Sequence, residues 1–272
     1  MSDPTVSIII PTRNRSELVK RAIRSALNQS YDNVEVVVID DGSAPEHLAA
    51  LSEFEAPGLT ILKNQTNRGG PYSRNRGWKS CNGDFIIFLD DDDQIEPEKV
   101  ELQIRKFKEL DDPEVGVVTS HAVDYRSSEK QIKYNRIRGD IHSKVLKSYE
   151  LHGIETMMIR KSCIEQINGF DPDLVANQEY DLIVRLSRVC KFDYVDEILS
   201  CENRSENQIN LNFGKKFKAA GQIWARHHPF WVQDGWKTVA YNYIRFLYLF
   251  SRYSIGMVFG EKVYRFVERQ KS

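Results

Sequence analysis

Short apolar runs alternate with stretches of helical periodicity over the first 120 or so residues of the chain. The runs are rich in β-branched and aromatic residues and are too short for helices, which is typical of strands buried on both faces of a sheet. They occupy residues 6–10, 34–39, 59–62, 85–89 and 115–119. Apolar residues at helical spacing lie between them, over about 14–27, 45–51, 72–81 and 97–107. Strands that alternate with helices predict an α/β fold with a mainly parallel, Rossmann-like sheet flanked by helices.

The pattern weakens between residues 120 and 152, which are rich in Lys, Arg, Tyr and Ser. We expect a loop with short elements there, with a mobile lid as an alternative. Order returns at 155–160, which reads as a strand, and residues 168–172 form a turn. A further helix is expected from Gln178 onward, with Asn177 as its N-cap.

From Phe213 onward, aromatic residues are interleaved with Lys and Arg. The basic residues Lys237, Arg245 and Arg252 interrupt the apolar run, so that no segment is suited to span a bilayer. Two interpretations remain open: a pair of helices that pack on the main domain, or an interfacial helix that contacts a membrane through residues 236–260. The change in character predicts a nucleotide-binding and catalytic domain at 1–212 and a helical C-terminal extension at 213–272.

Composition narrows the class of function. The chain has 272 residues, with 38 basic and 39 acidic side chains and a formal net charge of -1, so no nucleic-acid partner is expected. The four cysteines are dispersed without a Cys-x-x-Cys pair, which favours reduced thiols over a zinc site. Residues 1–4 show no basic or apolar leader, so we expect a cytoplasmic protein, with the inner face of the cell membrane as the alternative if the extension is interfacial.

The strand at 85–89 runs directly into four carboxylates, at residues 90–93. Two such charges about 5 Å apart repel by about 3 kcal/mol at an effective dielectric near 20, so a divalent cation would stabilise the cluster. Ligands of open α/β sheets bind at the carboxyl ends of the strands, which is where these acids lie. A solvated acidic turn is the alternative. The chain has neither a Gly-x-Gly-x-x-Gly fingerprint nor a Gly-Lys-Ser/Thr phosphate loop, so a nucleotide would be held differently.

Taken in order, these segments resemble the family 2 glycosyltransferases, which are inverting sugar transferases of the GT-A fold. The similarity covers about residues 6–199 and depends on several short motifs together. They are Val6-Ser7-Ile8-Ile9-Ile10-Pro11-Thr12-Arg13-Asn14-Arg15, Leu27-Asn28-Gln29-Ser30-Tyr31, Val38-Ile39-Asp40-Asp41-Gly42-Ser43, Asn67-Arg68-Gly69, Ser73-Arg74-Asn75-Arg76-Gly77, Leu89-Asp90-Asp91-Asp92-Asp93, Gly169-Phe170-Asp171, and Glu179-Tyr180-Asp181-Leu182 with Arg185-Leu186.

The resemblance implies a nucleotide-sugar site. Asp41 corresponds to the aspartate that accepts the ring N–H of uracil, which favours a UDP-sugar. Asp40 would support the ribose or only the turn. Arg74 would contact the diphosphate side, where a guanidinium matches paired oxygens, and an exposed helix arginine is the alternative. The loop after the first strand would also meet the nucleotide, through Pro11, Thr12 and Arg13.

The resemblance also implies a metal site of the Asp-x-Asp type. Asp92 would ligate Mg²⁺ or Mn²⁺, both of which take oxygen ligands and bridge to phosphates. Asp90 would reach the ribose or a metal-bound water, because alternate residues of an extended segment share a face. Asp91 would point toward the sugar.

The family's general base is the second acid of a Glu-Asp pair, and here the pair reads Gln178-Glu179. Glu179 is the predicted base and Asp181 the fallback, although we expect Asp181 to pair with Arg185 at i+4. A Tyr-Arg-x-His stretch is replaced by Cys201-Glu202-Asn203-Arg204, in which Arg204 stands in for the histidine at the diphosphate.

The predicted function is metal-assisted, inverting transfer of a sugar from a nucleoside diphosphate to an acceptor hydroxyl on a saccharide or lipid-linked saccharide. Because the Gln178-Glu179 pair departs from the family's Glu-Asp, a second interpretation stays open: the chain is an inactive relative that binds a nucleotide sugar or a glycan without turnover. A nucleotidyltransferase is a third interpretation, disfavoured because Pro11-Thr12-Arg13-Asn14 is not a glycine-rich loop.

Overall fold

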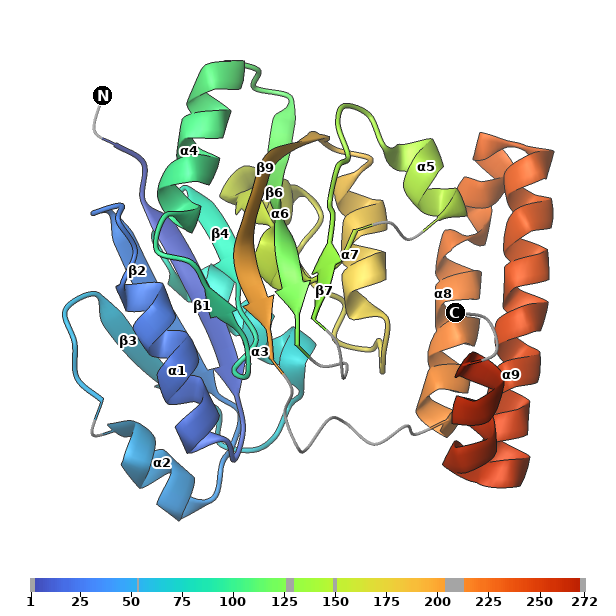
Figure 1. Cartoon of the computed structure of the whole chain (residues 1–272), viewed down its shortest axis with the longest axis horizontal. Helices are drawn as coiled ribbons and strands as arrows, with labels where there is room; N and C mark the ends of the chain where they lie inside the picture. Colours follow the sequence, from blue (N-terminus) through green and yellow to red (C-terminus); the bar gives the residue numbers. More distant parts are fainter. Residues whose placement is uncertain (1–2, 53, 126–129, 149–150, 204–212, 270–272) are drawn as a thin grey trace.

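A mixed sheet forms the centre of the molecule in the computed structural model (Figure 1), which describes residues 3–52, 54–125, 130–148, 151–203 and 213–269. Its strand order is β3-β2-β1-β4-β8-β6-β9-β5, and β7 pairs with β6. The strands are β1 (Val6–Thr12), β2 (Val34–Asp40), β3 (Leu59–Lys63), β4 (Phe85–Phe88), β5 (Gln94–Ile95), β6 (Val115–Asp124), β7 (Gln131–Lys133), β8 (Met158–Arg160) and β9 (Lys191–Glu202).

The first four strands are mutually parallel, since β1 pairs in parallel with both β2 and β4, and β2 with β3. β8 is antiparallel to its neighbours β4 and β6, and β6 is parallel to β9. The short strand β5 is antiparallel to β9. The expected α/β architecture is therefore confirmed, and each antiparallel pair includes β7, β8 or β9. The carboxyl ends of β1, β2 and β4 come together at one edge of the sheet.

Helices cover both faces of the sheet (Figure 1). They are α1 (Ser16–Leu27), α2 (Pro45–Ser52), α3 (Gly70–Ser80), α4 (Lys99–Leu110), α5 (His142–Lys147), the 3₁₀ turn η1 (Ile154–Thr156), α6 (Lys161–Gln166), α7 (Gln178–Leu186), α8 (Phe213–Asp234) and α9 (Trp236–Arg269). Alternate residues of β1 separate two cores. Ile8 and Ile10 pack with α1 and α4, whereas Ile9 faces the side of α3, α6 and α7.

The expected loop with short elements at 120–152 is wrong for its first residues, whereas β7 and α5 are short elements of the kind expected. β6 continues to Asp124 with every residue buried, β7 follows, and α5 begins at His142. The polar residues of this part of β6 made it resemble a loop in the sequence. They are buried because residues distant in the chain supply hydrogen bonds: Asn135 Nδ2 donates to the carbonyl of Ser120, and Asn135 N donates to His121 Nδ1. The strand expected at 155–160 is correct only for its last residues, since the turn η1 ends at Thr156 and the strand β8 spans Met158–Arg160.

The structure also corrects the expected cap of α7. Asn177 adopts a left-handed conformation (φ 58°) instead of the extended one that capping favours, and its side chain makes no capping hydrogen bond. The first turn of α7 is therefore held by other contacts.

The C-terminal helices α8 and α9 lie side by side next to α5 and α7 (Figure 1). Ile223 and Trp231 of α8 join the core that contains α7, and Asn242 of α9 donates to the carbonyl of Leu146 at 2.8 Å. These contacts support the packed interpretation for α8 and for the first part of α9. Within the described part of the chain, no helix combines the length and apolar character needed to cross a membrane. The boundary at 212/213 stays a prediction, because residues 204–212 lie outside that part.

Candidate active site

The acidic loop after β4 is held against the end of β1. Thr12 Oγ1 donates to Asp91 Oδ2 at 2.8 Å, and Arg15 Nη1 lies 2.9 Å from Asp91 Oδ1 and 3.2 Å from Asp92 Oδ2. Burial raises the pKa of Asp91 to about 6 even though Arg15 opposes the shift. Both oxygens of Asp91 thus have protein partners, so this residue shapes the loop. Arg15 was not among the site residues predicted from the sequence. It could have been found as a basic residue shortly after the first strand, which pairs with the strand that ends in the four acids.

The other three acids of this loop form a candidate metal centre. Each of Asp90, Asp92 and Asp93 offers a carboxylate oxygen, and these atoms all lie within 4.8 Å of one another. Burial, and next the charge of Glu155, raise the pKa of Asp93 to about 9. A set of hard oxygen donors fits Mg²⁺ or Mn²⁺. The sequence predicted only Asp92 as a ligand, so Asp90, which was expected to reach the ribose or a metal-bound water, and Asp93 are both additions to the candidate set.

Arg74 on α3 lies against this cluster. Its Nη2 is 2.5 Å from Asp90 Oδ1, and its guanidinium lies 5.5 Å from the centre of the Phe170 ring. Burial alone lowers the pKa of Arg74, but the charge of Asp90, with smaller contributions from Glu179 and Asp91, raises it above the ordinary value. Arg74 is buried, so the alternative of an exposed helix arginine is wrong. The structure therefore places a permanent cation beside the acids.

Asp41 joins the loops that follow β2 and β3. Its Oδ1 accepts from Asn64 Nδ2 at 2.7 Å and from the amide of Arg68 at 2.9 Å, and its Oδ2 accepts from the amide of Gly69 at 2.7 Å. Three of its acceptor positions are thus occupied, and a nucleobase N–H would share an oxygen with a backbone donor. Asp40 is also buried, and its Oδ1 has no hydrogen-bond partner in the described part of the chain.

Close contact between these loops depends on Gly42. Its φ is +69°, and a Cβ at this position would lie 2.7 Å from the backbone of Thr66 and Asn67. Glycine therefore lets the loop after β2 touch the loop after β3. At the neighbouring end of β1, Pro11 is half-buried and Arg13 is exposed.

Helix α7 carries the two acidic candidates for the general base. Glu179 lies in its first turn, is partly exposed, and is near enough to Arg74 to affect its pKa. Asp181 is fully buried, with Arg185 Nε and Nη2 at 2.9 and 2.6 Å from Oδ2 and His227 Nε2 at 3.0 Å from Oδ1. The expected pairing of Asp181 with Arg185 is confirmed, and its oxygens are turned away from solvent. Arg204 lies outside the described residues.

Glu155 of η1 is a further acid of this region that sequence analysis missed. It is 2% exposed, and burial, followed by the charge of Glu179, raises its pKa to about 7. Behind it, burial lowers the pKa of Lys99 to about 7, and Lys99 Nζ donates to Ser120 Oγ and to the carbonyl of Thr156 at 3.2 and 3.1 Å. The sequence around Glu155 does not indicate that this residue belongs to the site, because the residues that surround it in the fold are distant in the chain.

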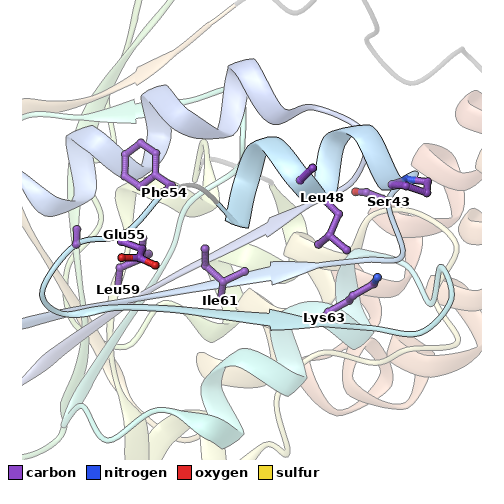
Figure 2. A pocket seen from close by; sticks show the side chains of 10 residues that line it. Ser43, Leu48, Phe54, Glu55, Leu59, Ile61 and Lys63 are labelled. Atoms are coloured by element: carbon purple, nitrogen blue, oxygen red, sulfur yellow. The ribbon is translucent and has the colours of Figure 1, made fainter.

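A surface cavity of about 710 Å³ lies between α2 and the edge strand β3 (Figure 2). Apolar side chains, among them Leu48, Phe54 and Ile61, line most of it, with Ser43 and Lys63 at one end. None of the acids of the loop after β4 borders it, so this cavity is separate from the candidate metal centre.

Comparison with known proteins gives the family. The sequence model described as "Glycosyl transferase family 2" matches residues 7–167. An uncharacterized glycosyltransferase, RP339, of Rickettsia prowazekii is 31% identical over 202 residues, which cover 72% of this chain and 63% of the relative. Chondroitin synthase of Escherichia coli is 28% identical over 230 residues, which cover 82% of this chain and 33% of that protein. The chain thus spans less than two thirds of the length of these relatives.

Two solved structures share the fold. Staphylococcus aureus TarS 1-349, in complex with UDP-GlcNAc, has a TM-score of 0.66 and 18% identity, covering 81% of this chain and 66% of that one. A mannosyltransferase of Pyrobaculum calidifontis, PcManGT, in complex with GDP-Man and Mn²⁺, has a TM-score of 0.67 and 18% identity, covering 100% of this chain and 80% of its own. The GT-A fold expected from the sequence is confirmed.

Proposed function

Because the chain belongs to glycosyl transferase family 2, we propose that it moves a sugar from a nucleoside diphosphate to an acceptor hydroxyl, with inversion at the anomeric carbon. One observation supports this most strongly. Arg74, which is paired with Asp90, also lies within electrostatic reach of Glu179, so the acidic loop, α3 and the first turn of α7 converge. A cation, a cluster of metal-binding oxygens and a candidate base are then available to one substrate.

The nucleotide would lie at the carboxyl ends of β1 and β2, bounded by Pro11, Thr12 and Arg13 on one side and by Asp41 on the other. The acceptor oxygens of Asp41 favour a pyrimidine with a ring N–H, and hence UDP. The UDP-GlcNAc complex of TarS supports a UDP-sugar, whereas the GDP-Man complex of PcManGT shows that a structurally similar protein binds a purine nucleotide.

Asp90, Asp92 and Asp93 would hold Mg²⁺ or Mn²⁺, whose charge would make the nucleoside diphosphate a better leaving group. Arg74 lies next to these acids and would bind the diphosphate oxygens from the side of α3. Thr12 binds Asp91, and Arg15 binds both Asp91 and Asp92, so these two residues would help to hold the acidic loop in place.

Glu179 would accept the proton of the acceptor hydroxyl as that oxygen attacks the anomeric carbon. Of the two acidic candidates on α7, only Glu179 is partly exposed, because Asp181 is buried and engaged by Arg185 and His227. Asp181 is therefore assigned to holding the helix and not to proton transfer.

The acceptor is proposed to be a saccharide or a lipid-linked saccharide at the inner face of the cell membrane. The support is a set of exposed apolar side chains on α9, namely Trp236, Ile244 and Leu247, which are 75%, 69% and 64% exposed. The exposed Lys237 lies next to Trp236, and a mixture of apolar and basic side chains is typical of helices that contact an anionic lipid surface.

Turnover distinguishes the enzyme from an inactive relative that only binds the donor. The 272-residue chain is incubated with Mn²⁺, a panel of saccharide acceptors and UDP-, GDP- or dTDP-sugars, and nucleoside diphosphate release is measured together with the anomeric configuration of the product. Metal-dependent release with an inverted product supports the proposal. Donor binding without release from any donor would favour the inactive relative.

A further inference from the structure

Helix α8 of the C-terminal extension supplies a buried histidine to the helix that carries the candidate base. His227 is fully buried, and its Nε2 lies 3.0 Å from Oδ1 of Asp181. Asp181 is two residues after Glu179 in the first turn of α7. The residues are 46 positions apart in the sequence, so the contact exists only because α8 packs on α7.

The other oxygen of Asp181 continues the connection into the donor side of the site. Arg185 binds Asp181 Oδ2 and donates through Nη1 to the carbonyls of Ile167 and Gly169, at 2.9 and 2.7 Å. The next residue, Phe170, is held by Asn75, which accepts from its amide at 2.8 Å and donates to its carbonyl at 2.7 Å. Asn75 neighbours Arg74 on α3, so the contacts run from α8 through α7 to the cation beside the acidic loop.

Helix α7 needs this support because its own N-terminus is weakly held. Asn177 does not cap it with a side chain, and the helix is only nine residues long. A buried carboxylate that loses one of its partners keeps its desolvation cost, so Asp181 would reorient if His227 were absent. Movement of the first turn displaces Glu179, and a misplacement of about 1 Å in a reacting group costs about 10²-fold in rate.

The same side of α7 receives other residues of the extension. Arg226 pairs with Asp171, just before α7, and its Nη1 lies 3.8 Å from Asp181 Oδ1. On α9, the guanidinium of Arg245 lies 5.4 Å from the centre of the Tyr180 ring. Both helices of the extension therefore contact residues next to Glu179.

We propose that His227 is a positioning residue for sugar transfer, which fixes Asp181 and thereby the orientation of Glu179. The inference depends on the proposed function of Glu179 as base. It makes α8 part of the active site's framework, so that the extension is required for full turnover even when the donor still binds.

Two amides at position 227 test this. The Nε2 of glutamine can reach the place of the imidazole Nε2, whereas the shorter asparagine cannot reach Asp181. His227→Asn should lower kcat by about 10²-fold with the affinity for UDP and Mn²⁺ within about two-fold of wild type. His227→Gln should recover most of kcat. The matched control is His228→Asn, since the neighbouring His228 stacks on Trp224 and is not bonded to Asp181.

Hydrogen exchange gives a second readout that does not need turnover. His227→Asn should speed exchange of the α7 amides, residues 178–186, relative to His227→Gln and His228→Asn. Wild-type kcat in His227→Asn, equal kcat for the Asn and Gln variants, or loss of UDP affinity in parallel with kcat would each overturn the positioning role. If wild type itself shows no turnover but exchange in α7 responds as described, the proposed function fails while the structural coupling of α8 to α7 stands.

Discussion

Arg74 Nη2 lies 2.5 Å from Asp90 Oδ1, at the point where α3 meets the acidic loop. The pair joins a buried guanidinium to a partly exposed carboxylate that belongs to the candidate metal centre. A diphosphate bound beside this pair would meet the cation of Arg74 and, through a metal ion, the acids of the loop. The guanidinium is therefore held in position by the protein's own contacts.

Arg74 tests this relationship. Arg74→Lys keeps a positive charge but loses the planar fork that can bind two oxygens at once, so we expect UDP affinity to fall by about ten-fold or more. Calorimetric titration with UDP and Mn²⁺ measures the loss. Arg105→Lys is the matched control, since Arg105 is exposed on α4 and pairs only loosely with Glu109 of the same helix. Unchanged affinity in Arg74→Lys would remove Arg74 from the diphosphate site.

Asp92→Asn should abolish metal-dependent nucleotide binding, because the variant loses a charged ligand of the candidate centre. The measurement is Mn²⁺-dependent UDP affinity, with full activity assayed in parallel. Glu98→Gln removes an exposed acid close in sequence and should behave as wild type. Retained metal dependence in Asp92→Asn would exclude Asp92 as a ligand.

Glu179→Gln removes the proposed base and keeps the shape of the side chain. Since general-base catalysis contributes about 10²–10⁴-fold, kcat should fall within that range while UDP affinity is preserved. Steady-state kinetics with a fixed acceptor give the comparison. A greater loss of kcat in Asp181→Asn, with α7 intact by hydrogen exchange, would move the role of base to Asp181.

Asp181 also makes stability depend on pH. Burial alone would raise the pKa of Asp181, but the hydrogen bonds of His227 and the charge of Arg185 outweigh it and hold the pKa below the ordinary value of 3.8. Its ionised form therefore stabilises the native state above about pH 4, and that contribution is lost as pH falls through the native pKa. Urea unfolding between pH 3 and 6 should show a shallower acid loss in Asp181→Asn than in wild type. Equal slopes would contradict the assignment.

The exposed side chains of α9 can be tested at Leu247, which is 64% exposed. Leu247→Glu should weaken sedimentation with vesicles that contain anionic lipid, since it adds a negative charge to the proposed contact surface. Gln131→Glu, at an exposed position on β7, gives the matched control for the added charge. Equal partitioning of the Leu247→Glu variant and wild type would contradict membrane contact through this face.

Local sequence pattern predicted the parallel half of the sheet and the acidic loop because each depends on neighbours in the chain. β4 is a run of buried residues, and Asp90 to Asp93 follow it directly. The contacts that define the site are different in kind. Asp91 meets Thr12 across 79 positions, and His227 meets Asp181 across 46. Such contacts depend on which elements pack together, and periodicity carries no information about that pairing.

The buried polar residues around β6 could not be predicted from the sequence for the same reason. Asn135 makes hydrogen bonds to Ser120, His121 and His152 and so keeps β6 buried despite its polar residues. Glu155 and Lys99 are ordinary charged residues in the sequence, and only the fold brings them into the core. A strand whose polar groups are satisfied at long range looks like a loop until its partners are known.

Crystals grown with UDP and Mn²⁺ give the most direct test of the central claim, that the acids after β4 hold a cation beside a diphosphate. The account predicts an anomalous peak from manganese bound to Asp92 and to the diphosphate, with the Arg74 guanidinium next to the phosphate oxygens. UDP bound with no manganese at these acids, or bound elsewhere on the molecule, would contradict it.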